Sequence, residues 1–246
     1  MASSAEQFAS SFNFGALSKA ADLKKRIWFT LAALVVYRLG TYIPIPGIDP
    51  AVLKEIFDQN AGGILGMFDM FAGGALGRMT IFALNIMPYI SAAIIMQLMT
   101  AVSPNLDTLK KEGEAGRKKI NQYTRYLTVL LAAVQAYGIS VGLENMASGG
   151  GAAVVNPGLF FRATTVITLV GGTVFLMWLG EQITARGIGN GISLIIFAGI
   201  VANLPQALAG TLELGRTGAL SAAFIVLLLL MAIAVIAFIV FIERSQ

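Results

Sequence analysis

The chain has 246 residues, of which 57% are hydrophobic and 12% charged, and its mean hydropathy is +0.77. Soluble domains carry about 25% charged residues, so this composition excludes a soluble globular protein. The absence of Cys and His excludes a disulfide framework, a thiolate nucleophile, a Cys-type zinc site and an imidazole base. The net charge of +4 would be compatible with a nucleic-acid partner, but the placement of the basic residues indicates another role.

The first 26 residues are polar and end in a basic cluster, Lys19, Lys24, Lys25 and Arg26. Because no cleavable apolar segment precedes this cluster, residues 1–26 are predicted to be a cytoplasmic N-terminal tail rather than a secretory signal. The first hydrophobic stretch follows, from Ile27 to about Ile48, and is interrupted by Arg38. Pro44 and Pro46 close it, and it is the first predicted membrane span.

A shorter apolar segment, residues 62–77, follows with the sequence GGILGMFDMFAGGALG. It is too short to cross a membrane and contains Asp69 and Gly-Gly pairs. Irregular backbone at membrane depth must be buried in protein or line a cavity, so we expect a re-entrant, mobile apolar stopper. A helix lying in the membrane interface is the alternative that the composition leaves open.

Five more windows approach or exceed the roughly 20 apolar residues that a spanning helix needs, which gives six predicted spans. These windows are residues 79–106, 126–143, 162–180, 187–212 and 217–242. Pro88 lies ten residues into the first of them, and there it would remove a backbone hydrogen bond and kink the helix.

The basic residues predict the orientation of these spans. With a cytoplasmic N-terminus, twelve Lys and Arg residues lie inside and three outside, while Arg38 and Arg78 lie at membrane depth. The positive-inside rule therefore predicts that both ends are cytoplasmic. Many of the inside charges fall in the loop 103–125. This loop is predicted to be either a solvated loop that sets the topology or a docking surface for a phosphate-bearing partner such as ribosomal RNA.

Two glycine-rich segments and one isoleucine pattern also need an interpretation. The run Ser148 to Ala153 predicts a flexible outer loop. The glycines at 187, 189 and 191 lack the strand and acidic residue of a dinucleotide site, and a tight turn with close helix packing is the better interpretation. Two isoleucine pairs spaced by four residues each share a helix face, but spacing alone does not separate pore-lining from ordinary packing residues.

Five stretches together resemble the bacterial SecY family, whose members are the central subunits of the Sec protein-conducting channel. They are YIPIPGID (42–49), MFDMFAGGAL (67–76), NIMPYISAAIIMQL (85–98), KKEGEAGRKKINQYTRY (110–126) and WLGEQITARGIGNGISLIIFAGIV (178–201). The resemblance implies an all-α polytopic transmembrane helix bundle of SecY type, with ten spans in two inverted halves and a re-entrant plug helix. On this basis residues 1–26 are the tail, 27–217 are spans one to five with the plug at about 63–77, and 218–246 are span six and the start of a truncated second half.

The resemblance also implies roles for particular residues. The pore ring would comprise Ile86, Ile90, Ile192 and Ile196. The plug would include Gly63, Ile64, Leu65, Met67, Phe68, Met70, Phe71, Gly73 and Gly74. The lateral gate would use Pro88, Ser91, Gln97 and Gln135, and cytoplasmic docking would use Lys110, Lys111, Arg117, Lys118 and Lys119.

The implied function is passage of unfolded polypeptides across, or laterally into, the cell inner membrane, without enzymatic chemistry and without a cofactor or metal. The implied partners are SecE and SecG, the SecA motor ATPase or a translating ribosome, the signal sequences of client polypeptides, and the lipid bilayer. A secondary transporter or channel for small solutes is the alternative, and it would require ion-coordinating groups at mid-membrane that the spans scarcely offer. An intramembrane hydrolase would require a paired nucleophile and base or two acids, and Asp69 has no evident acidic partner.

Overall fold

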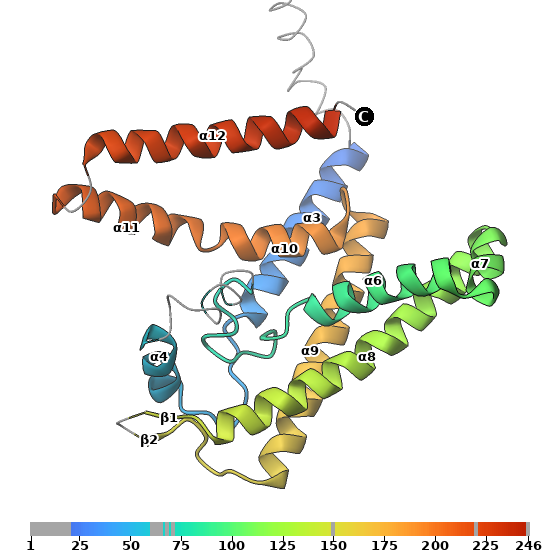
Figure 1. The fold of residues 1–246 in the computed structure, drawn as a ribbon, viewed down its shortest axis with the longest axis horizontal. Coiled ribbons are helices and arrows are strands. Elements are labelled where there is room, and N and C mark those ends of the chain that lie inside the picture. The colour runs from blue at the N-terminus through green and yellow to red at the C-terminus, as the bar shows by residue number, and fades with distance from the viewer. Residues whose placement is uncertain are drawn as a thin grey trace, which may run out of the picture. The chain divides into compact units, whose positions relative to one another are not determined.

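The computed structural model describes residues 21–59, 66, 69, 72–148, 151–218 and 221–244. The chain forms two compact units, one ending at Ile200 and the other running from Val201 to Gln246. Figure 1 shows that the described elements are almost all helices. The predicted all-α class is therefore confirmed, and the sole sheet among the described residues is a two-stranded hairpin.

The first unit begins with α3 (Ala21–Gly40), which corresponds to the first predicted span. The helix ends at Gly40, before the two prolines, and residues 43–45 run in extended conformation beside residues 79–81. The Ile45 amide donates to the Met79 carbonyl at 2.9 Å and the Ile81 amide to the Ile43 carbonyl at 3.0 Å. A short amphipathic helix, α4 (Pro50–Gln59), follows and buries Leu53.

The second predicted span differs from the expectation. Residues 79–86 form turns and a bridge, and helix α6 begins only at Met87 and ends at Val102. Met79 and Asn85 have positive φ values of 44° and 49°, which interrupt a regular helix. Pro88 consequently lies in the first turn of α6, where its missing amide costs no intrahelical hydrogen bond. The predicted proline kink is wrong for this reason.

Helix α7 (Pro104–Lys111) follows α6 after a bend of 100° and leads into the longest helix, α8 (Glu114–Glu144). The strands β1 (Ala147–Ser148) and β2 (Gly151–Ala152) then form an antiparallel hairpin. The Asp49 amide donates to Ala153, and Ala153 and Val154 are buried. The prediction of a merely flexible outer loop is wrong, because the described part of this run packs against the segment that follows α3.

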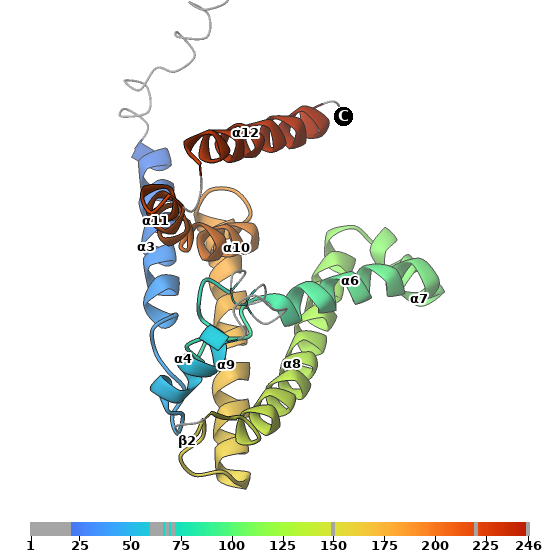
Figure 2. The ribbon, with the colours of Figure 1, turned by 60° about the vertical axis from the view of Figure 1, so that its left-hand side comes forward.

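Two further helices complete the first unit. Helix α9 (Leu159–Arg186) lies beside α8, as Figure 2 shows, and α10 (Gly191–Val201) follows the glycine turn, with its first residue packed against Gly180 of α9. A Cβ atom on Gly191 would overlap the carbonyl oxygen of Gly180, and one on Gly187 would lie 2.5 Å from Thr30 Oγ1. These contacts confirm that the glycines permit close helix packing.

The second unit contains α11 (Leu204–Arg216) and α12 (Ala222–Arg244). The two helices touch where Gly215 approaches Ile225. The apolar side chains of α12 are largely exposed, which is the pattern of a helix that faces lipid or other protein.

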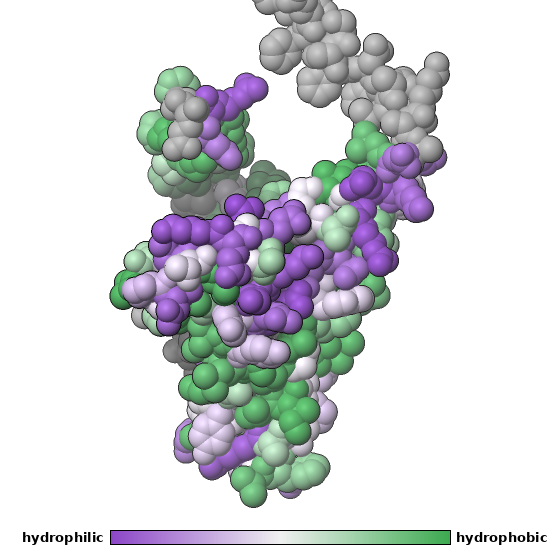
Figure 3. Space-filling model, turned by 90° about the vertical axis from the view of Figure 1, so that its right-hand side faces the viewer, coloured by the Kyte–Doolittle hydropathy of each residue, from purple (hydrophilic) through white to green (hydrophobic). Residues whose placement is uncertain are grey.

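Among the described residues, four helical stretches are long and apolar enough to cross a membrane, and the bent pair α6 and α7 makes a fifth if it counts as one span. The four are Glu114–Glu144, Leu159–Arg186, Gly191–Arg216 and Ala223–Arg244. Helix α3 falls outside this group because its 20 residues include five charges. The face in Figure 3 shows hydrophilic side chains gathered over α7 and the start of α8, with an apolar zone beneath them.

Candidate functional site: a groove between α6 and α8

A groove of about 550 Å³ runs between α6 and α8. It brings together two of the four predicted gate residues, Ser91 of α6 and Gln135 of α8, and both are exposed. Its remaining wall comes from the turns that precede α6 and from apolar positions of both helices, namely Ala72, Leu76, Ala83, Leu84, Asn85, Met87, Gly138 and Ile139. The groove is therefore mostly apolar, with a few amide and hydroxyl groups, and suits an apolar helix better than a polar solute.

The other two predicted gate residues lie elsewhere. Pro88 is buried at the start of α6 and is absent from the lining of this groove. Gln97 is six residues beyond Ser91 and so points to a different side of α6. It lines a separate pocket of about 520 Å³ together with Lys110 and Arg117, two of the predicted docking residues.

Three of the four predicted ring isoleucines belong to one apolar cluster. Ile86 is 1% exposed and part of the cluster core, and Ile90 and Ile192 are half-buried against it. The α10 isoleucine at the centre of this cluster is Ile195, which is fully buried, whereas Ile196 is half-buried beside it. The structure thus brings the starts of α6 and α10 together through branched apolar side chains.

Most of the predicted plug lies outside the described residues, namely Gly63, Ile64, Leu65, Met67, Phe68, Met70 and Phe71. The two described members, Gly73 and Gly74, have φ values of +66° and +78°, a conformation that favours glycine. Asp69, also described, accepts a hydrogen bond from the Gly77 amide at 2.7 Å. Its carbonyl accepts one from the Gly74 amide, so the segment ends in a defined turn.

Two arginines stabilise this turn. Both are predicted from the sequence to lie at membrane depth, without a predicted role. Arg38 Nη1 donates to the Gly73 carbonyl at 3.0 Å, and Arg78 Nε donates to the Gly74 carbonyl at 2.8 Å. Both guanidinium groups also lie over the Tyr42 ring, with their Cζ atoms 5.1 and 4.4 Å from its centroid. Cation–π contact and backbone carbonyls stabilise these charges. No sequence signal links Arg38 to Gly73 or Arg78 to Tyr42, because these residues are far apart in the chain and meet only in the fold.

The five predicted docking residues are all exposed, at the end of α7 and in the first turns of α8. Lys111 forms an ion pair with Asp107 of the same helix at 2.7 Å. The buried Gly116 lets α8 approach α7 so closely that a Cβ would overlap the Leu109 carbonyl oxygen. The bend between α6 and α7 and this close contact together present the basic residues on one surface.

The described residues contain no group of three or more Asp or Glu residues that could hold a metal ion. Two ion pairs join neighbouring helices instead, Arg125 with Glu181 and Glu144 with Arg162. Sequence reasoning missed these pairs because each joins residues far apart in the chain. The geometry offers apolar surfaces and scattered amides, which favours binding of apolar segments over bond-making chemistry.

Comparisons with known proteins agree with this description. The family model described as SecY matches residues 80–246. The protein translocase subunit SecY of Escherichia coli K12 is 58% identical over 225 residues, covering 92% of this chain and 51% of that protein. The SecY subunit of Vibrio cholerae is 56% identical over 231 residues, covering 94% of this chain and 51% of that protein. The chain thus spans about half the length of these relatives.

Two solved structures share the fold. They are "The structure of a protein conducting channel" and "Sec61 in the Canine ribosome-channel complex from the endoplasmic reticulum". Each matches with a TM-score of 0.52 and 22% sequence identity, over 78% of this chain and 38% of the solved one. At this identity the likeness concerns the arrangement of the helices alone.

Proposed function

Because this chain belongs to the SecY family, we propose that it is the N-terminal part of a protein-conducting channel subunit that passes unfolded polypeptides across, or laterally into, a membrane. The observation that carries the proposal is the family match over residues 80–246. The groove between α6 and α8 supports it, since its apolar lining with Ser91 and Gln135 suits the apolar helix of a signal sequence. The work is conduction and needs no catalytic group or cofactor.

We further propose that Ile86, Ile90, Ile192 and Ile196 form one half of an apolar constriction. Branched side chains can close around a passing chain and hinder ions by dewetting, without binding the polypeptide tightly. The packing of Ile86 and Ile90 in one cluster with Ile192 and Ile195 of α10 supports this role. The segment at about 63–77 would seal the constriction as a plug, and its C-terminal turn at Gly73 and Gly74 would be its anchor.

We propose a cytoplasmic N-terminus and a location in the cell inner membrane, because twelve basic residues would then face the cytoplasm and three the outside. The exposed basic surface at the end of α7 and the start of α8 would dock the SecA motor ATPase or a translating ribosome. SecE and SecG would complete the channel, and the remaining length of the family's subunits would supply the opposing wall.

Replacing the four proposed ring isoleucines by Ser in the full-length protein tests the constriction. We expect a higher ion conductance of planar bilayers containing the purified channel, because polar side chains keep the constriction wet. A matched control replaces four exposed isoleucines by Ser and should leave conductance unchanged: Ile94, Ile95, Ile167 and Ile188. Unchanged conductance of the ring variant would refute the ring, and a selective change in small-solute uptake would favour a transporter.

A photo-crosslinking amino acid at position 91 or 135 tests the groove. We expect both positions to crosslink to a signal sequence during insertion, because both line the same cavity. Position 97 is the internal comparison, since it faces a different pocket and should crosslink far less. Equal crosslinking at all three positions would contradict the assignment of this groove.

A further inference from the structure

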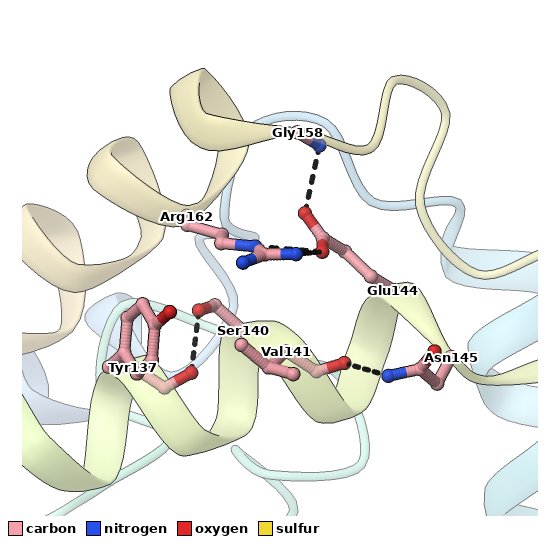
Figure 4. A network of polar contacts seen from close by, with 7 residues as sticks. All are labelled: Tyr137, Ser140, Val141, Glu144, Asn145, Gly158 and Arg162. Carbon is pink, nitrogen blue, oxygen red and sulfur yellow. Dashed lines mark hydrogen bonds and ion pairs between the residues drawn. The ribbon is translucent and has the colours of Figure 1, made fainter.

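Helices α8 and α9 are joined at one end by an ion pair that also caps a helix. Glu144 Oε2 accepts hydrogen bonds from Arg162 Nη2 at 2.6 Å and Nε at 2.8 Å, and its Oε1 accepts the Gly158 amide at 2.8 Å. Figure 4 shows this carboxylate between the guanidinium and the amide that precedes α9. A carboxylate at a helix N-terminus is favourable, and the Glu144 side chain is only 8% exposed. The Glu144–Arg162 contact therefore holds α8 and α9 firmly together at this end.

A second ion pair joins the same two helices nearer their other ends. Arg125 Nε donates to Glu181 Oε1 at 2.9 Å and its Nη2 to Oε2 at 2.7 Å. This fork-to-fork geometry fixes orientation as well as distance. The acidic and basic partners are exchanged between the two pairs, since α8 supplies Arg125 and Glu144 while α9 supplies Glu181 and Arg162.

The two pairs are equally spaced along both helices. Nineteen residues separate 125 from 144 on α8, and nineteen separate 162 from 181 on α9. At about 1.5 Å per residue each interval is about 28 Å long, close to the roughly 30 Å thickness of a bilayer's hydrocarbon core. Neither interval contains a charged residue.

Exposed aromatic side chains flank both pairs. Tyr126 (69% exposed) and Trp178 (50%) lie near the Arg125 pair, and Phe160 (86%) and Tyr137 (52%) lie near the Arg162 pair. Aromatic residues, Trp and Tyr above all, gather at the two membrane–water interfaces. Between these levels most exposed side chains are apolar, as at Leu130, Val134 and Ile167, whereas the exposed Gln135 lines the groove.

We propose that the two ion pairs lie at the two membrane–water interfaces and hold α8 and α9 in register as one hairpin whose surface between them contacts lipid acyl chains. A slip of either helix by one turn would break both pairs and draw an unpaired charge into the hydrocarbon, which is costly. The pairs thus fix both the register of the helices and their depth in the bilayer. Through them α8 becomes the fixed wall of the groove, whereas α6 carries no charged residue to clamp it. The depth and register do not depend on the proposed conduction.

Cysteine accessibility tests the depth. Single cysteines are introduced into a cysteine-free, full-length protein in native membrane vesicles. Tyr123→Cys and Leu159→Cys place a cysteine just beyond each ion pair, and Leu130→Cys and Ile167→Cys place one between the two pairs. All four positions are exposed on the protein. We expect a membrane-impermeant maleimide to label the first two rapidly, each from one side only, and the second two at least tenfold more slowly. Equal labelling rates at all four positions would overturn the proposal.

Charge exchange tests the register. We expect Arg125→Glu and Glu181→Arg to lower the midpoint of heat inactivation in detergent, and the double variant to recover at least half of that loss. The exchange of Glu144 with Arg162 should recover less, because arginine cannot accept the Gly158 amide. The exposed pair Glu213 and Arg216, within a single helix, is the matched control and should shift the midpoint little. If the double variant lowers the midpoint of heat inactivation by as much as the two single variants together, the proposed clamp is overturned.

Discussion

At the scale of single residues, glycines decide how closely the helices of the first unit approach. A Cβ on Gly191 would overlap the Gly180 carbonyl oxygen, and one on Gly172 would overlap that of Ile81. Membrane helices lack a strong hydrophobic drive to associate, so close van der Waals contact through small residues carries much of their packing. The glycines at such crossings are therefore structural, because a larger residue would hold the helices apart.

Gly191→Ala tests this role. We expect it to destabilise the protein by about 1–3 kcal/mol, the usual range for overpacking, because backbone atoms cannot move aside as a flexible side chain can. Gly142→Ala is the control, since nothing lies within 4 Å of its Cβ position in α8. That variant should be neutral or more stable by up to about 1 kcal/mol. Thermal unfolding in detergent measures both, and equal stability of the two variants would contradict the packing argument.

At the scale of elements, the start of α6 differs most from the sequence prediction. The uncharged window that begins at Met79 contains eight non-helical residues before the helix starts at Met87. Hydropathy does not distinguish a helix from buried turns, whereas the positive φ values at Met79 and Asn85 do. The turns carry the chain from the proposed plug to the groove, so they position Ser91 rather than merely bend a helix.

Pro88→Ala should therefore have a small effect, below about 1 kcal/mol, because Pro in the first turn neither removes a helical hydrogen bond nor kinks the helix. Ile94→Pro, at an exposed position in the middle of α6, should cost about 3 kcal/mol. Chemical denaturation in detergent, followed by circular dichroism, compares the two. A loss for Pro88→Ala as large as that for Ile94→Pro would mean that the helix extends upstream of Met87.

At the scale of the whole molecule, the position of a charged residue follows its depth relative to the membrane: charges lie mostly at the ends of the spans and not within them. The spans are nearly free of charge, five exposed basic residues gather at the end of α7 and the start of α8, and two ion pairs bound the apolar length of α8 and α9. Positive charge in short loops is retained on the cytoplasmic side during insertion. The same residues can thus direct topology first and bind a partner afterwards.

Reversal of the five docking charges to Glu tests the orientation: Lys110, Lys111, Arg117, Lys118 and Lys119. We expect a measurable fraction of molecules, about a tenth or more, to mis-insert spans two and three, because the strongest retained cluster is lost. Reporter fusions after α6 and α8 measure the side reached by each loop. Lys54→Glu with Arg216→Glu, two charges assigned to the outside, is the control and should leave topology intact. Full retention of topology in the five-residue variant would contradict the orientation.

The sequence by itself determined the all-α class and the family, and four of its six predicted spans correspond to helical stretches that are long and apolar enough to cross a membrane. It did so because hydropathy, loop charge and contiguous motifs are local signals that need no knowledge of the fold. Local signals also sufficed for the glycine turn before α10, whose spacing already indicated close packing. They failed at Pro88 and in the hairpin after α8, where burial against distant segments overrides what the composition suggests.

Only the tertiary structure decided which residues meet. It placed Ser91 with Gln135 and sent Gln97 to another pocket, although all three were predicted to share one site. It set Arg38 and Arg78 on the turn at Gly73, and it joined α8 to α9 through charges far apart in the chain. The physical reason is that hydrogen bonds and ion pairs depend on atomic distances of about 3 Å, which a sequence pattern records only within one helix or turn.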